Sequence, residues 1–458
     1  MALSTTLFGE TFTFESVKEV LGRASELRSG DVQAGLAPRS MREMAAAKWV
    51  LAELPLATLY ENPSVPYEDD EVTRVAVDDL DRRAYQRVCG WTVADLREWI
   101  LDGDTTGEEI AAISPGLTPE MAAAVAKLMS NLDLVVAGRK IRVIVRCNNT
   151  LGLPGRISSR LQPNHPRDSV AGVLAAVKDG LSFGNGDAVI GVNPATGSVQ
   201  STADILKALK DFMRRFRVPT QNCVLSHLTV QMKAMERGAP LDLMFQSIAG
   251  SEGANKNFGI SVALLDEAWD MTLRLGTAQG PNVMYFETGQ GTALSANAHH
   301  DTDQMTMEAR CYALARRYKP FLLNSVVGFI GPEYLRDGKE ITRAGLEDHF
   351  MGKLMGIPMG CDACYTNHAR ADQNDQENLE LLLATAGVNY LMGIPMGDDI
   401  MLNYQTTSFH NNAAVRELLG LRPAPEFERW MEERGLWRNG RLTARAGDAS
   451  VFAVNEAE

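Results

Sequence analysis

Residues 282–287 read NVMYFE, a short apolar run that ends on a single carboxylate, Glu287. A run of this length, rich in apolar and aromatic residues, is typical of a buried β-strand. A strand that stops at a charged residue brings that residue to the end of its sheet. Glu287 is therefore the first candidate for chemistry.

Similar runs recur from about residue 140 onward, separated by longer amphipathic stretches. This alternation indicates βα units, and eight parallel strands are the number that closes a barrel. We predict an α/β fold, a (β/α)8 TIM barrel that carries the catalytic site, over residues 138–425. The eight runs are 141–147, 187–193, 223–230, 243–248, 282–287, 321–329, 354–359 and 390–396.

The first third of the chain is predicted to be helical. Residues 15–28 should form a helix that ends at Ser29-Gly30, and residues 41–54 a second one. Thr92 with Asp95 fits a capping box, and Thr118-Pro119-Glu120 combines an N-cap, a first-turn proline and an acid that complements the helix dipole.

These patterns divide the chain into three parts. We expect a helical N-terminal region over residues 1–137, the barrel over 138–425, and a C-terminal helix with a polar tail over 426–458.

One heptapeptide occurs twice near the end of the predicted barrel. Leu354–Gly360 and Leu391–Gly397 both read LMGIPMG, 37 residues apart. The spacing suits one βα unit. Internal duplication and chance reuse of a favourable strand-to-loop sequence both account for it.

Composition restricts the kind of partner. The formal net charge is −13 over 458 residues, which argues against nucleic acid because phosphate binding needs clustered Lys and Arg. The chain shows no secretion signal and no long uncharged apolar stretch, so we expect no membrane partner and a cytoplasmic location. Six dispersed cysteines fit reduced thiols.

Polar residues stand at the ends of several predicted strands, where the loops of a barrel converge. Each has a structural alternative: a turn at Asn193-Pro194, a backbone-amide partner for Gln246, or a helix cap for a lone acid. Convergence favours function, because polar groups buried together need a ligand or each other. A small cation suits the set best. The residues at these strand ends are Asn193, Gln246, Glu287 and Asp362, together with the apolar Phe329. Arg160 and Gln162 lie in the long connection after the first run.

Other patterns are weaker. Phe183–Asp187 and Glu287–Gly291 contain glycines but match neither a dinucleotide fingerprint nor a P-loop, so we interpret them as turns. Cys361-Asp362-Ala363-Cys364 has CxxC spacing without the further ligands of a zinc site, and we predict no metal site. His299-His300 beside Asp301 and Asp303 is interpreted as a solvated loop.

The chain as a whole resembles the large subunit of ethanolamine ammonia-lyase. The segments that carry the resemblance are ELRSGD (26–31), YEDD (67–70), SRLQPN (159–164), GLSFGNGDAVIGVNP (180–194), FQSIAGSE (245–252), YFETGQGTALSA (285–296), VVGFIGPEYL (326–335), AGLEDHFMGKLMGIPMGCDACYTNHA (344–369) and MGDDIMLNYQTTSFHN (396–411).

The resemblance implies a barrel whose open end faces adenosylcobalamin, which a separate small subunit also holds in a large hetero-oligomer. It implies radical deamination of ethanolamine to acetaldehyde and ammonia. Substrate would contact Arg160, Gln162, Asn193, Glu287 and Asp362, with Glu287, Arg160 and Asp362 catalytic. The corrin would face Pro194, Gln246, Ser295 and Met401. It leaves residence in a bacterial microcompartment open.

A histidine motif is relevant to this expectation. Some corrinoid enzymes replace the base of the cofactor by the histidine of an Asp-x-His-x-x-Gly sequence, but here Glu347 stands at the Asp position of Glu347–Gly352. The resemblance implies that the cofactor keeps its own base on cobalt.

Two other functions compete with this interpretation. A barrel lyase or aldolase would need a metal cluster or a Schiff-base lysine, for which Lys353 is the near candidate. An inactive scaffold would have no reason to bury the polar set.

Overall fold

Eight parallel strands form the centre of the computed structural model, which describes residues 3–399 and 401–453. Neighbours in the sheet are also neighbours among the barrel strands in sequence, and β13 pairs with β5. A hydrogen bond from Leu243 N to Asn222 O (3.3 Å) joins the two remaining edges. The strands are β5 (Ser158–Leu161), β6 (Val189–Val192), β7 (Asn222–Val224), β8 (Met244–Ser247), β9 (Met284–Thr288), β10 (Leu322–Val326), β11 (Met359–Asp362) and β13 (Tyr390–Gly393).

The predicted α/β barrel is therefore confirmed, although its first strand was placed wrongly. Residues 141–147 lie outside the barrel, where Val145–Arg146 (β3) pairs with Thr150–Leu151 (β4). The real first strand, β5, reads SSRL and escapes an apolar search because its buried residues are polar. Arg160 thus lies on a strand, and not in the connection after one.

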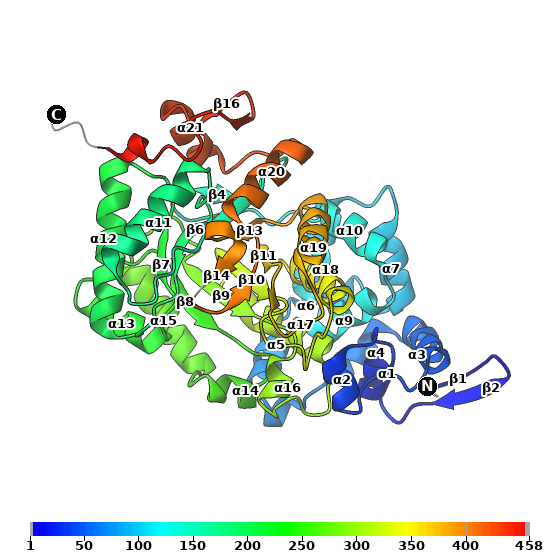
Figure 1. Ribbon diagram of the computed structural model, residues 1–458. Helices are drawn as coiled ribbons and strands as arrows, with labels where there is room; N and C mark the ends of the chain where they lie inside the picture. The colour runs from blue at the N-terminus through cyan, green and yellow to red at the C-terminus, as the bar shows by residue number, and fades with distance from the viewer. Residues whose placement is uncertain (1–2, 400, 454–458) are drawn as a thin grey trace.

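A ring of helices surrounds the barrel (Figure 1). Most of these helices bury one amphipathic face against the strands, whereas α17 and α18 are buried along almost their whole length because the N-terminal region covers their outer side. The longer members are α11 (Val170–Ser182), α12 (Val199–Phe216), α13 (Leu228–Glu236), α15 (Val262–Leu275), α17 (Gln304–Arg317), α18 (Gly338–Leu354), α19 (Gln373–Thr385) and α20 (Phe409–Leu419), and shorter ones are α14 (Glu252–Asn257) and α16 (Thr292–Ser295).

The two LMGIPMG copies have different structures. Leu354 ends α18, Gly356 follows with a φ of +81°, and Met359 starts β11 with no exposed surface. In the second copy Leu391 lies within β13, and Met396 has a φ of +59° and is 82% exposed. The copies occupy different places in their βα units, so the seventh predicted strand, 354–359, was set too early.

The N-terminal region packs beside the barrel, to the right in Figure 1. Its predicted caps at Thr92 and Thr118 are present. The helix expected over 15–28 ends at Arg23, and Ser29-Gly30 begins a new helix instead of ending one. Its helices are α1 (Val17–Arg23), α2 (Ser29–Gln33), α3 (Met41–Glu53), α4 (Leu56–Glu61), α5 (Glu71–Asp78), α6 (Arg82–Gln86), α7 (Val93–Leu101), α8 (Gly107–Ile113), α9 (Pro119–Lys127) and α10 (Asn131–Lys140).

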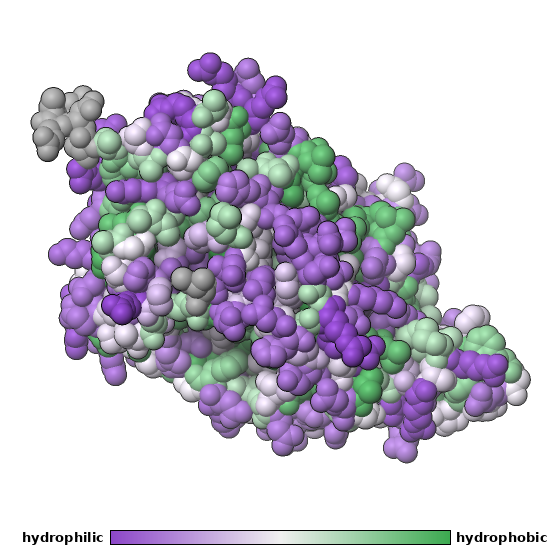
Figure 2. All heavy atoms as spheres, viewed as in Figure 1, coloured by the Kyte–Doolittle hydropathy of each residue, from purple (hydrophilic) through white to green (hydrophobic). Residues whose placement is uncertain are grey.

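Among the described residues, small sheets and the last α-helix complete the structure. One three-stranded sheet joins β12 (Tyr365–Thr366), β15 (Tyr404–Gln405) and β14 (Asp398–Asp399). An N-terminal hairpin, β1 (Ser4–Leu7) with β2 (Glu10–Thr13), was not predicted. After the barrel come α21 (Pro425–Glu433) and the β16 (Trp437–Arg438) and β17 (Arg441–Leu442) hairpin, at the top of Figure 1. The face shown in Figure 2 is largely hydrophilic, with apolar patches between. Within the described residues, no helix is long and apolar enough to cross a membrane.

Buried ion pairs join the N-terminal region to the barrel helix α17 and its N-cap residue, Asp303. Arg310 contacts Asp70 at 2.7 Å and Glu120 at 3.2 Å, and Lys127 contacts Asp303 at 2.7 Å. All of these side chains are almost fully buried. Removal of one partner would leave an uncompensated charge, so these pairs fix where the N-terminal region docks.

We expect Arg310→Met to lower the free energy of unfolding by about 3–5 kcal/mol, because Asp70 and Glu120 lose their buried counter-charge. Chemical denaturation followed by circular dichroism measures the change. The control is Arg441→Met, since Arg441 is 66% exposed and its ion-pair partner Glu417 is 65% exposed; its effect on the free energy of unfolding should stay within about 1 kcal/mol. Equal effects of the two variants would contradict the assigned importance of the buried pairs.

Candidate functional site

A cavity of about 320 Å³ opens at the carboxyl ends of the barrel strands. We call it the polar cavity. Its walls come from strands far apart in the sequence, because barrel closure brings their ends together. All five residues expected to contact substrate line it: Arg160 of β5, Gln162 after β5, Asn193 after β6, Glu287 of β9 and Asp362 of β11.

Arg160 forms the base of this cavity. Its Nη1 donates to Glu287 Oε1 (2.5 Å) and lies 2.6 Å from the Tyr285 hydroxyl, which itself donates to Glu287 Oε1 (2.6 Å). Burial opposes its charge, but Tyr285 and Glu287 raise the pKa of Arg160 above its ordinary value. Arg160 Nε and Nη2 are buried without a protein partner. The guanidinium therefore keeps donors free for a ligand oxygen.

Gln162 and Asn193 form an ordered amide pair. Asn193 Nδ2 donates to Gln162 Oε1 (2.9 Å), while Gln162 Nε2 donates to Asp399 (2.6 Å) and to the Tyr404 hydroxyl (3.0 Å). Asp399 follows β13 and is nearly buried. These bonds orient both amides before any ligand arrives.

Asp362 is enclosed by two hydroxyl donors. Tyr404 donates to Oδ2 at 3.1 Å, and Thr406 donates to Oδ1. Burial raises the pKa of Asp362 to about 7, although the Thr406 hydrogen bond and the Arg160 charge lower it. The carboxyl is therefore poised to change charge near neutral pH, and a nearby cation would favour its ionised form.

The rest of the cavity wall is mainly apolar. Phe245, Ile248, Val326 and Leu402 line it. Phe329 also lines it from the loop after β10, although it was expected to close that strand. A pocket with apolar walls, two carboxyl groups, one guanidinium and two amides suits a small polar ligand that carries a positive charge and a hydrogen-bonding oxygen.

The four residues expected to face the corrin do not line this cavity. Pro194, Ser295 and Met401 lie in or next to the loops after β6, β9 and β13, on the same face of the barrel. Gln246 lies within β8, and its Oε1 accepts the Leu228 backbone N–H (3.0 Å). This contact is the backbone-amide bond that the sequence left as the structural alternative for Gln246.

Several other sequence candidates have structural roles. His349 is buried on α18 against Gly138 of α10, and Glu347 pairs with Arg28 and Arg343. Asp303 caps α17 and pairs with Lys127, so the expected solvated loop is wrong at this residue. Within residues 3–399 and 401–453, no group of three or more His, Cys, Asp or Glu side chains could hold a metal ion.

The two remaining alternatives also take definite positions. Cys361 and Cys364 are buried free thiols. Lys353 lines a different cavity, at the amino ends of the strands, and no lysine lines the polar cavity in the described part of the chain. The Schiff-base hypothesis therefore has no lysine at the site.

Sequence reasoning missed four residues of the network. Tyr285 lies two positions before Glu287 in β9 and thus points to the same side of that strand, which was an available signal. Asp399, Tyr404 and Thr406 come from the segment after β13. Only the fold brings that segment over β5 and β11.

The fold and the cavity define a (β/α)8-barrel protein with a small-molecule site at the carboxyl ends of its strands. The family model for the ethanolamine ammonia-lyase large subunit matches residues 12–445. The large subunit from Salmonella typhimurium (strain LT2) is 57% identical over 452 residues, 99% of this chain and 100% of that protein. The Escherichia coli (strain K12) large subunit is 56% identical over the same shares. The chain belongs to the ethanolamine ammonia-lyase large subunit family, whose members are lyases.

We expect Asp399→Asn to loosen the Met401–Tyr404 segment. Asp399 Oδ1 accepts the backbone N–H groups of Met401 (3.0 Å) and Leu402 (2.8 Å), and Oδ2 accepts Gln162 and Asn164. Amide hydrogen exchange of Met401 and Leu402 should accelerate by about tenfold or more, because an amide group cannot accept all four bonds.

The control for this variant is Asp398→Asn, which changes the exposed neighbour; its carboxylate accepts a hydrogen bond from the exposed side of Gln405 and holds no backbone N–H group of the described residues. Unchanged exchange in Asp399→Asn, or equal acceleration in both variants, would show that Asp399 does not hold the segment.

Proposed function

We propose that this chain is the catalytic large subunit of an adenosylcobalamin-dependent enzyme that converts ethanolamine to acetaldehyde and ammonia. One observation carries the proposal: two carboxyl groups and a guanidinium with free donors converge in a cavity of about 320 Å³. Membership of the family supports it, since the relatives carry this enzyme's name.

The cavity offers a binding mode for a two-carbon amino alcohol. Glu287 and Asp362 present carboxyl oxygens to the ammonium group, and Gln162 supplies an amide oxygen already fixed by Asn193. Arg160 Nε and Nη2 lack protein partners and can donate to the hydroxyl oxygen, with Asn193 beside it. The carboxyl oxygens and the guanidinium thus offer separate partners to the ammonium and hydroxyl groups, which orients the substrate.

The charged groups also act on the reacting substrate. Arg160 is 1% exposed and is held by Tyr285 and Glu287. Its charge is therefore already in place and needs no reorientation as charge moves between the oxygen and the nitrogen of the substrate. Asp362 can take up or release a proton at Oδ1 or Oδ2, because its pKa is about 7. The apolar walls exclude water from this exchange.

The mouth of the barrel fits a broad, partly apolar cofactor. Phe329 is 38% exposed and Met396 82% exposed, and they follow β10 and β13 on the face that the cavity opens to. Pro194, Ser295 and Met401 lie at the same face and, with Gln246, are the residues that would hold the corrin. When bound, adenosylcobalamin supplies the organic radical that removes hydrogen from the substrate.

The proposal includes a protein partner and a location. We infer a small subunit that completes the cofactor site and a large hetero-oligomer of both subunits, in the cytoplasm or within a bacterial microcompartment. The name of the relatives as large subunits supports the partner.

The purified chain, its small subunit, adenosylcobalamin and ethanolamine, mixed without oxygen, test the function. Acetaldehyde and a paramagnetic signal of cob(II)alamin paired with an organic radical are expected. If the fully loaded enzyme gives neither acetaldehyde nor the paramagnetic signal, the proposal is refuted.

Glu287→Gln should reduce turnover by at least about a hundredfold, because the change removes the carboxylate charge and keeps the side-chain volume. Since the buried Arg160 loses its counter-charge, the unfolding midpoint should fall, while the circular dichroism spectrum at the assay temperature stays that of the folded chain. The control is Glu333→Gln, since Glu333 is exposed in the loop after β10 and lines no part of the cavity. Acetaldehyde formation measures both variants. Turnover of Glu287→Gln near that of the control would contradict the assigned role.

The pH profile should depend on Asp362. Its raised pKa, about 7, means that the carboxylate form that binds the ammonium disappears as pH falls below 7. We expect kcat/KM for ethanolamine to fall by up to about tenfold per pH unit below 7. Thr406→Val removes a bond that lowers this pKa, so the acid limb should move to higher pH. An unmoved limb would exclude Asp362 as its source.

A further inference from the structure

The opposite end of the barrel contains a larger cavity, of about 910 Å³. It lies at the amino ends of β9, β10 and β11, because Asn282, Pro320 and Pro358 line it just before these strands begin. We call it the floor cavity. A second cavity of about 280 Å³ adjoins it and shares two lining residues, Arg142 and Lys353.

Positive charge gathers in the floor cavity although the chain as a whole carries −13. Its acidic lining residue, Asp79, is already paired with Arg317 at 3.0 Å. Against it stand five basic lining residues: Arg142, Arg316, Arg317, Lys319 and Lys353. Over the described residues, only Arg317 of these five has a carboxylate within 4.0 Å. Such a local surplus attracts anions.

Two donors at the cavity have no protein acceptor, and the Lys353 ammonium beside them donates to a single carbonyl. Arg316 Nη2 and the Trp269 indole Nε1 are buried without a hydrogen-bond partner. Lys353 is 2% exposed, and its ammonium donates to the Gly387 carbonyl (2.8 Å). Burial, with a smaller effect of Arg142, lowers the pKa of Lys353 to about 7. Unsatisfied buried donors are costly, and an oxyanion would satisfy them.

The walls between these donors are apolar. The segment Ile141–Val145 runs along the cavity, although it belongs to the first predicted barrel strand. Ile144 is 54% exposed. Met355 and Ile357 line it from the loop between α18 and β11. A bare inorganic ion would leave this apolar surface in water.

We propose that the floor cavity binds one small organic oxyanion, a phosphate or carboxylate group attached to an aromatic or aliphatic body. The oxyanion contacts Arg142, Arg316 and Lys353, and the body packs on Ile144, Ile357 and the Trp269 ring. Guanidinium and ammonium groups together match this chemistry, and the cavity has the volume of a small-molecule site.

The floor cavity and the polar cavity lie at opposite ends of the same barrel strands and share no lining residue. The loop Met355–Pro358 lines the floor and leads directly into β11, which ends at Asp362. A ligand at the floor therefore does not touch the residues proposed to bind substrate. Its binding does not depend on the reaction proposed above.

Isothermal titration of the full chain with phenyl phosphate tests this site. One saturable site per chain is expected, with benzoate as the carboxylate arm and neutral benzamide as the uncharged one. Phenyl phosphate or benzoate should bind at least about tenfold more tightly than benzamide, and more tightly than inorganic phosphate. The tighter of the two anions identifies the oxyanion class.

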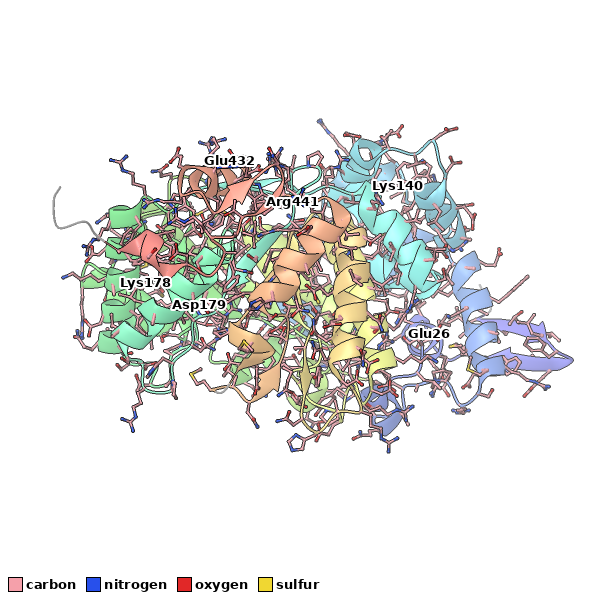
Figure 3. All side chains as sticks on the ribbon, turned by 45° about the horizontal axis from the view of Figure 1, so that its top comes forward. Glu26, Lys140, Lys178, Asp179, Glu432 and Arg441 are labelled. Atoms are coloured by element: carbon pink, nitrogen blue, oxygen red, sulfur yellow. The ribbon has the colours of Figure 1, made fainter. Side chains whose placement is uncertain are left out.

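Variants locate the site. Arg142→Met and Lys353→Met should each weaken binding at least about tenfold. Arg142 is exposed, so its variant remains informative if Lys353→Met fails to fold. The control is Arg441→Met, because Arg441 lies on the C-terminal extension (Figure 3) and lines neither basic cavity. Absence of saturable binding, benzamide binding as tightly as the anions, or equal affinity in Arg142→Met and Arg441→Met would each overturn the proposal.

Discussion

A guanidinium enclosed inside the barrel is the constraint around which this structure is built. Arg160 is 1% exposed, and removing such a charge from water costs several kcal/mol unless partners compensate. Glu287 and Tyr285 from β9 supply that compensation. Because these partners come from the opposite side of the barrel, the ion pair requires the closed cylinder and also holds its strands in register.

The same requirement extends outward through the network. Glu287 has one oxygen engaged with Arg160 and Tyr285, and Asp362 is held by Tyr404 and Thr406. Asp399 then fixes Gln162 and the segment that carries Tyr404. Each polar group is positioned by another, yet Arg160 Nε and Nη2 remain free.

The two ends of the barrel differ in charge. Carboxyl and amide groups surround the mouth, whereas guanidinium and ammonium groups surround the floor. The N-terminal region contributes to the floor through Asp79, Ser114 and the segment after α10, and buried pairs such as Arg310 with Asp70 fix its position. Docking of this region thus shapes the second cavity as well as the core.

The barrel and most of its strands could be predicted from the sequence alone, and the family resemblance implied five of the residues that line the polar cavity. Apolar runs that stop at Asn193 and Glu287, and one that ends shortly before Asp362, are local patterns, and local patterns follow strand periodicity. The sequence could not identify β5, because Ser158, Ser159 and Arg160 are polar and are buried only by their partners, such as Asp187 for Ser159.

The heptapeptide LMGIPMG has two different structures in this chain, and the difference comes from tertiary contacts. LMGIPMG closes a helix at Leu354 and continues a strand at Leu391, so its fold depends on the surrounding elements. Tertiary contacts likewise took the strand-like segment Ile141–Val145 out of the barrel, and brought Tyr404 and Thr406 to Asp362. Burial and charge pairing act between residues distant in sequence, and no local pattern records them.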